Sequence, residues 1–290
     1  MKKIAILTAC LALAMALVGC TSAPKDQSAD STQSIALIDQ APTPSASNLG
    51  GSASVEAVAA ALEQTGLSNT STFKEFAQDF ADVAGSNANL ADDFVDPDRL
   101  APDLTACMNG WEAAHTFSDA DCRMTAMLLL SDVVTSKADL PTYTGTYLMF
   151  DLDAIQNVER YAPLKEHEAL FTTLFGEMPV QGDNVEDALP AWWKQHGISI
   201  TNKNVSLISV GIYDPNDNVV FIGHTGVLVQ YDDYVLFVEK LAFEQPYRVT
   251  KAADANEIIT MLAARPEYQP GESVGERTII YINDEPVVTI

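Results

Sequence analysis

Residues 219–241 read VVFIGHTGVLVQYDDYVLFVEKL, the most strand-like part of the chain. Two runs rich in Val, Ile, Phe and Tyr, residues 219–231 and 234–243, flank the dipeptide Asp232-Asp233. Such runs are typical of strands, and a polar dipeptide between them is typical of a hairpin turn. A similar run at residues 205–213 precedes them. The three runs predict an antiparallel meander.

The sequence before residue 200 has helical periodicity instead, with apolar residues three and four positions apart. We expect helices at residues 55–64, 73–83, 119–134, 164–175 and 185–196, then a helix at 256–264 and a last hairpin of residues 278–282 and 287–290. Gly197 stands where a helix C-cap is expected. Helices followed by antiparallel strands predict an α+β fold, with N-terminal helices packed on a C-terminal sheet in one domain, residues 53–290.

The N-terminus has the pattern of a secretory signal. A basic start, Met1-Lys2-Lys3, precedes an apolar stretch from Ile4 to Val18. That stretch is shorter than the roughly 20 apolar residues of a membrane-spanning helix. A small residue before a cleavage point completes the pattern, so we expect a signal peptide at residues 1–19.

Residues 17–20, Leu-Val-Gly-Cys, resemble the lipobox of bacterial lipoproteins. The resemblance implies lipid attachment at Cys20 and a chain held on the extracytoplasmic face of the cell membrane. An ordinary cleaved signal followed by a chance cysteine is the alternative. Residues 20–52 are rich in Ser, Ala, Thr, Gln and Pro, and we expect a flexible tether with a reach of about 30 Å.

The net charge of the chain limits the classes of partner that it can bind. The formal net charge is −24, and removal of Lys2 and Lys3 with the signal peptide would make it −26. Such a surface repels phosphate backbones, so we expect no nucleic-acid partner. It repels anionic headgroups as well, so the membrane contact is expected through the lipid on Cys20. We expect no metal or other cofactor.

Two cysteines, Cys107 and Cys122, remain after Cys10 leaves with the signal and Cys20 is lipidated. They are open to three interpretations: a disulfide, an inert core thiol, or a nucleophile at Cys122. Ser118 and Asp121 form a capping box, which places Cys122 in the first turn of a helix. The helix N-terminus and Arg123 lower a thiol pKa there, whereas the carboxylates of Asp119 and Asp121 raise it, and the sign of the net shift stays open.

His224 and Glu239 are candidates for a pair across the hairpin. If Asp232-Asp233 is a two-residue loop, Gly226 lies opposite Glu239, and His224 is its diagonal neighbour about 7 Å away. Gly226 then leaves room between the two side chains. A loop of odd length would put them on opposite faces of the sheet. Glu239 on a buried face needs a partner, and Lys240 points to the other face.

A cysteine at a helix start, a histidine on a strand and a polar residue on the next strand resemble the papain-like cysteine hydrolases, in particular the NlpC/P60-type branch that cleaves peptidoglycan. The resemblance implies a papain-like fold, with Cys122 as nucleophile, His224 as base, Glu239 as the residue that orients the imidazole, and a peptidoglycan or peptide substrate. The chain lacks that branch's Asp-Cys-Ser/Thr-x-Phe run, because Arg123, Met124 and Thr125 follow the cysteine. This departure leaves the substrate class open.

Four segments resemble a bacterial lipoprotein family known as domain of unknown function 4300. They are residues 121–126, 147–151, 224–228 and 236–247. This resemblance covers most of residues 70–290 and implies no catalytic residues. Two functions therefore stand side by side: a cysteine-dependent amidase or peptidase acting on cell-wall peptides, and a non-catalytic surface lipoprotein that binds a ligand or protein partner.

Overall fold

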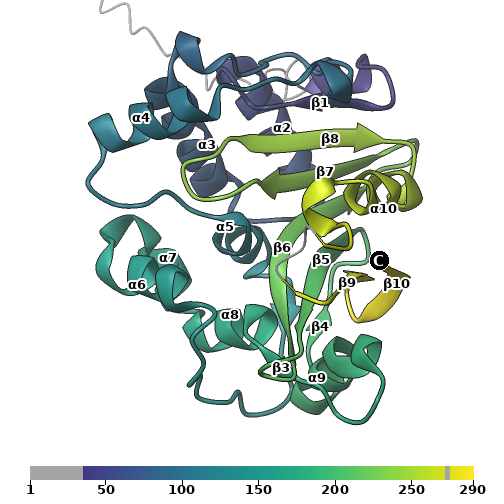
Figure 1. The fold of residues 1–290 in the computed structure, drawn as a ribbon. Coiled ribbons are helices and arrows are strands. Elements are labelled where there is room, and N and C mark those ends of the chain that lie inside the picture. Colours follow the sequence, from purple (N-terminus) through teal and green to yellow (C-terminus); the bar gives the residue numbers. More distant parts are fainter. Residues whose placement is uncertain (1–34, 272–274) are drawn as a thin grey trace, which may run out of the picture.

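The computed structural model describes residues 35–271 and 275–290, and Figure 1 shows their arrangement. The α-helices are α2 (Ser52–Gln64), α3 (Thr70–Ala84), α4 (Leu104–Ala114), α5 (Cys122–Leu130), α6 (Met149–Asn157), α7 (Ala162–Lys165), α8 (Glu168–Phe175), α9 (Ala188–His196) and α10 (Ala255–Ala263). Short 3-10 helices are η1 (Ser86–Ala88), η2 (Pro97–Arg99), η3 (Glu159–Tyr161), η4 (Val185–Asp187) and η5 (Pro266–Tyr268). The strands are β1 (Ser45–Ser47), β2 (Val134–Thr135), β3 (Met178–Pro179), β4 (Ser199–Ile200), β5 (Val205–Asp214), β6 (Val219–Gln230), β7 (Val235–Lys240), β8 (Tyr247–Ala252), β9 (Arg277–Ile282) and β10 (Glu285–Thr289).

The main sheet is antiparallel and has the order β1-β8-β7-β6-β5-β9-β10, with β3 against β6. Helices precede the long strands along the chain, so the expected α+β class is confirmed. The β6–β7 hairpin turns through Asp232-Asp233, where the N–H of Tyr231 donates to the carbonyl oxygen of Tyr234 at 2.9 Å. Gly226 therefore pairs with Glu239, as the sequence predicts.

Helices cover both faces of the sheet. On one face α5 packs against β6 and β7, and Met127 joins a large core with Val227 and Val238. On the other face α10 packs against β8, and its Leu262 joins a smaller core with Phe237. Each fully buried side chain of this size stabilises the fold by about 1.5–3 kcal/mol. The sheet is thus held between two helical layers.

The expected helices are present with shifted bounds, and α4 and α6 are helices that the sequence patterns did not predict. The helix expected at residues 119–134 begins only at Cys122, because Asp121 is its N-cap and accepts a hydrogen bond from the N–H of Met124 at 2.9 Å. Ser118, which we expected as the cap, lies in the preceding loop. The helix expected at 164–175 is divided into α7 and α8. Gly197 ends α9 with a φ of 61°, as a C-cap glycine does.

The tether expected at residues 20–52 is wrong for its second half. Residues 35–52 pack onto the domain: Ile38 is fully buried, and β1 pairs with the edge strand β8. Lys251 of β8 donates to the carbonyl oxygens of Ile38, Asp39 and Ala41. Composition missed this because backbone hydrogen bonds attach the segment, and these depend little on side-chain polarity.

The signal peptide and Cys20 lie outside the described residues. Within residues 35–271 and 275–290, no helix has the length and apolar character that crossing a bilayer demands.

Candidate active site

His224 and Glu239 meet across the β6–β7 hairpin. His224 Nε2 lies 2.7 Å from Glu239 Oε2, and the two residues are only 4% and 1% exposed. The diagonal pair that the register predicts is therefore in contact. The expected space at Gly226 is not open, because a Cβ there would lie 2.5 Å from the ring of Phe237. The glycine makes room for that ring rather than for the pair.

Arg265 supplies the cation that Glu239 needs. Its Nη2 donates to Glu239 Oε1 at 2.6 Å, and Arg248 Nε is 4.0 Å from the same oxygen. Burial alone would raise the pKa of Glu239, but the charge of Arg265 and the His224 contact outweigh it and hold that pKa well below its usual value. Glu239 is therefore ionised. Arg265 follows α10 in the chain, and nothing in the sequence around it indicates that it contacts β7.

Cys122 is the first residue of α5, and its thiol is free and buried. The backbone N–H of Thr225, the residue after His224 on β6, lies close to this thiol and acts to lower its pKa. Burial, and next the charge of Asp121, raise the pKa of Cys122 to about 12, although Arg123 opposes the shift. The net shift of the Cys122 pKa, which the sequence left open, is therefore upward, and the thiol is protonated at neutral pH.

The three candidate residues gather at one stretch of β6, but they are not fully connected. In the part of the chain that the structure describes, no hydrogen bond joins the sulfur of Cys122 to the imidazole of His224. Cys107 is also a free, buried thiol, so the disulfide interpretation is wrong.

A second buried charge cluster ties α5 to α6 and β6. Arg123 donates to both carboxylate oxygens of Asp151, at 2.8 and 2.9 Å, and to the carbonyl oxygen of Ile222 at 3.0 Å. Asp121 lies 2.9 Å from the same guanidinium. Burial and the neighbouring Asp121 raise the pKa of Asp151 to about 8. Two carboxyl groups share one cation, and Asp151 therefore retains a proton around neutral pH.

Lys240 points to the other face from Glu239, as expected. It forms a fully buried ion pair with Asp119 at 2.8 Å. Its ammonium nitrogen also lies 3.9 Å from the centre of the Phe80 ring.

The segments that carry the family resemblance converge on these clusters, because Asp121, Asp151, His224 and Glu239 each come from a different one of the four. A family model described as Domain of unknown function (DUF4300) matches residues 45–287. The chain belongs to this family. No curated protein and no solved structure matches it. The DUF4300 region begins at the first residue of β1 and includes every buried charge described above.

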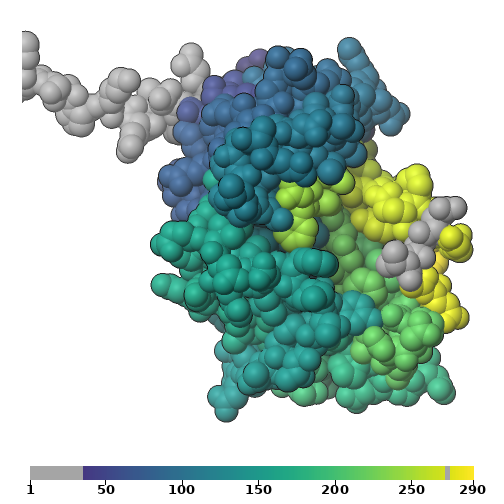
Figure 2. Space-filling model, turned by 60° about the vertical axis from the view of Figure 1, so that its left-hand side comes forward, coloured from purple at the N-terminus to yellow at the C-terminus, as the bar shows by residue number. Residues whose placement is uncertain are grey.

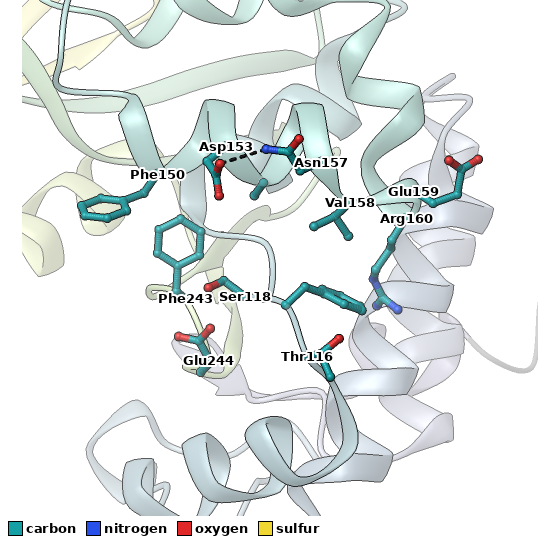
Figure 3. A pocket seen from close by; sticks show the side chains of 12 residues that line it. Thr116, Ser118, Phe150, Asp153, Asn157, Val158, Glu159, Arg160, Phe243 and Glu244 are labelled. Atoms are coloured by element: carbon teal, nitrogen blue, oxygen red, sulfur yellow. Dashed lines mark hydrogen bonds between the residues drawn. The ribbon is translucent and has the colours of Figure 1, made fainter.

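The DUF4300 region also contains a cleft of about 870 Å³, shown in Figure 3. It lies between the loop that leads into α5 and one side of α6 with the start of η3, and the β7–β8 turn closes one side. Figure 2 shows this face, with the yellow-green β7–β8 turn between the blue α4 region and the teal α6 region. Within residues 35–271 and 275–290, no group of three or more His, Cys, Asp or Glu side chains could hold a metal ion.

Proposed function

We propose that the chain is a lipid-anchored, extracytoplasmic cysteine-dependent amidase or peptidase that acts on cell-wall peptides. Cys122 is the nucleophile, His224 the base and Glu239 the residue that orients the imidazole. The observation that carries the proposal is the buried 2.7 Å contact of His224 with Glu239, one residue from the backbone N–H that lies close to the Cys122 thiol. The papain-like order of the three residues along the chain supports it.

The first step forms a bond between the sulfur of Cys122 and the carbonyl carbon of an amide. His224 takes the thiol proton as the bond forms, and the carbonyl π electrons move to oxygen. The tetrahedral intermediate collapses with cleavage of the C–N bond, and the imidazolium gives its proton to the leaving amine. Water then attacks the thioester, His224 again takes a proton, and the acid and the free thiol are released.

The charge states of Cys122 and Glu239 bear on these reaction steps. The raised pKa of Cys122, about 12, means that the proton leaves only during attack, so the mechanism requires the His224 ring to come within hydrogen-bond reach of the thiol when substrate binds. Ionised Glu239, held by Arg265, stabilises the imidazolium that forms. Nε2 of His224 contacts Glu239, which leaves Nδ1 for the thiol proton.

Thiol labelling tests the proposal. Iodoacetamide alkylation is measured from pH 5 to 10 on a chain carrying Cys20→Ser and Cys107→Ala, so that the reactive thiol of the mature chain is Cys122. The same chain with His224→Ala is the comparison. If His224 takes the thiol proton, labelling near pH 7 is at least tenfold faster in the chain with His224 than in the His224→Ala chain. Equal labelling rates of the two chains at every pH would exclude His224 as the base.

A non-catalytic surface lipoprotein is the second candidate. The burial of Cys122 and the pKa of about 12 favour it, because an inert core thiol has the same properties. In that case labelling of Cys122 is slow at all pH values and depends only on unfolding. Urea below the unfolding transition then raises the labelling rate in proportion to the unfolded fraction, and it does so with or without His224.

A further inference from the structure

The cleft of Figure 3 has aromatic walls that solvent reaches. Phe117, Phe150 and Phe243 line it, and Phe150 is 71% exposed. Aromatic side chains gathered in one concave surface, rather than scattered singly, are typical of a binding site. Val158 and Ala154 add further apolar lining. The cleft therefore offers a ligand both apolar contact and ring faces.

The charges of the cleft are unbalanced. Arg160 is the cation among the lining residues, and its charge is already used, because Asp79 lies 2.6 Å from its Nη1 and the guanidinium stacks over Phe76 at 4.2 Å. Asp153 and Glu244 also line the cleft, and in the described part of the chain neither forms an ion pair within 4.0 Å. Figure 3 shows both carboxylates on the same side of the cleft as Phe150 and Phe243, away from Arg160.

We propose that this cleft binds a peptide through a lysine-type side chain, with the ammonium group between Asp153 and Glu244 and the methylene stem against Phe150 and Phe243. Carboxylates attract the ammonium, and the faces of phenyl rings attract cations as well. The volume of about 870 Å³ lies near the upper end of small-molecule sites and exceeds what a single amine fills, which favours a peptide with flanking residues.

This inference does not rest on the proposed hydrolysis. None of Cys122, His224 and Glu239 lines the cleft. Binding is measured on the mature chain with Cys122→Ala, which removes turnover. If Cys122 labelling excludes the hydrolase, the binding result still stands. If the cleft binds no peptide, the Cys122 labelling result still stands.

Isothermal titration with three probes tests the ligand class. The probes are the peptide acetyl-Leu-Lys-Leu-amide, the same peptide with its lysine Nε acetylated, and 1,5-diaminopentane. We expect the first peptide to bind at least tenfold more tightly than either of the others. Equal affinity for the acetylated peptide would overturn the role of the ammonium, and equal affinity for 1,5-diaminopentane would overturn the peptide as the occupant.

Variants place the binding in this cleft. Asp153→Asn with Glu244→Gln removes the two charges, and Phe150→Ala removes the exposed ring. We expect each to weaken binding of the lysine peptide at least tenfold, whereas Asp183→Asn, an exposed carboxylate outside the cleft, leaves it within twofold. Lack of binding by the parent chain, or unchanged binding by both cleft variants, would refute the proposal.

Discussion

At the scale of single residues, two buried carboxyl groups differ in charge because they differ in partners. Glu239 has Arg265 to itself and contacts His224, so it stays ionised. Asp151 shares Arg123 with Asp121, so one carboxyl group of that pair has no cation of its own. Since the dielectric response of the interior is weak, the excess charge is removed by binding a proton.

Asp151 therefore makes stability depend on pH. Its folded pKa, about 8, is above that of an unfolded aspartate, so its contribution is fully present below about pH 4 and is lost as the pH rises through 8. Asp151→Asn should flatten the fall in unfolding free energy between pH 5 and 8 by on the order of 3–4 kcal/mol. Urea unfolding at several pH values measures this. Asp153→Asn, at an exposed position on the same helix, should keep the parent slope. An unchanged slope for Asp151→Asn would contradict the raised pKa of Asp151.

The ion pair of Arg265 with Glu239 should contribute strongly to the folding stability of the chain. Arg265→Met leaves a buried carboxylate without its main cation, which costs about 3–5 kcal/mol at pH 7. The folded pKa of Glu239 lies below its unfolded value of about 4.5, so its stabilising contribution is present above pH 4.5 and is lost as the pH falls. The difference between variant and parent should therefore shrink below pH 4 in urea unfolding. Arg277→Met, at a half-exposed ion pair, should change stability by less than about 1 kcal/mol at either pH.

At the scale of elements, the composition of a segment does not show whether it packs against the domain. The segment at residues 35–41 reads as part of a linker, yet it is anchored by one residue of β8. Lys251 satisfies three carbonyl oxygens there, and burial lowers its pKa. Helix α5 likewise depends on a single side chain, Asp121, for its start.

Lys251→Met should release the N-terminal segment without unfolding the domain. Three carbonyl oxygens lose their donor, at a cost of about 1–3 kcal/mol for each buried one left unpaired. Hydrogen exchange at residues 45–47 should accelerate at least tenfold, while exchange in β6 stays as in the parent chain. Lys203→Met, an exposed lysine outside the sheet, is the matched control. Equal acceleration in β6 would mean global destabilisation instead.

At the scale of the whole molecule, the Lys240–Asp119 ion pair joins the central sheet to the loop before α5. Lys240→Met should destabilise the chain by about 3–5 kcal/mol, because Asp119 remains as a buried, unpaired charge. Adding Asp119→Leu should recover much of that loss, since both charges are then absent. A double-mutant cycle in urea measures the coupling. Strictly additive losses would show that the pair contributes no coupling energy.

The proposed lipid anchor also belongs to this scale. Cys20→Ser should move the chain from the membrane fraction to the soluble fraction, and it should abolish incorporation of a labelled fatty acid. Cys107→Ser, at a buried thiol, should leave both unchanged. Membrane retention of the Cys20→Ser chain would contradict lipid attachment at this residue.

Much of the fold and part of the site followed from local patterns. Alternation along residues 219–241, together with a two-residue turn, determines which side chains share a face, so the pairing of Gly226 with Glu239 and the contact of His224 with Glu239 could be predicted. The charge states of the buried groups, in contrast, follow from the three-dimensional arrangement. Burial and neighbours from distant segments determine the ionised state of Glu239, the raised pKa of Asp151 and the raised pKa of Cys122. Strand register is a local property of the chain, whereas electrostatic energy depends on distances in space.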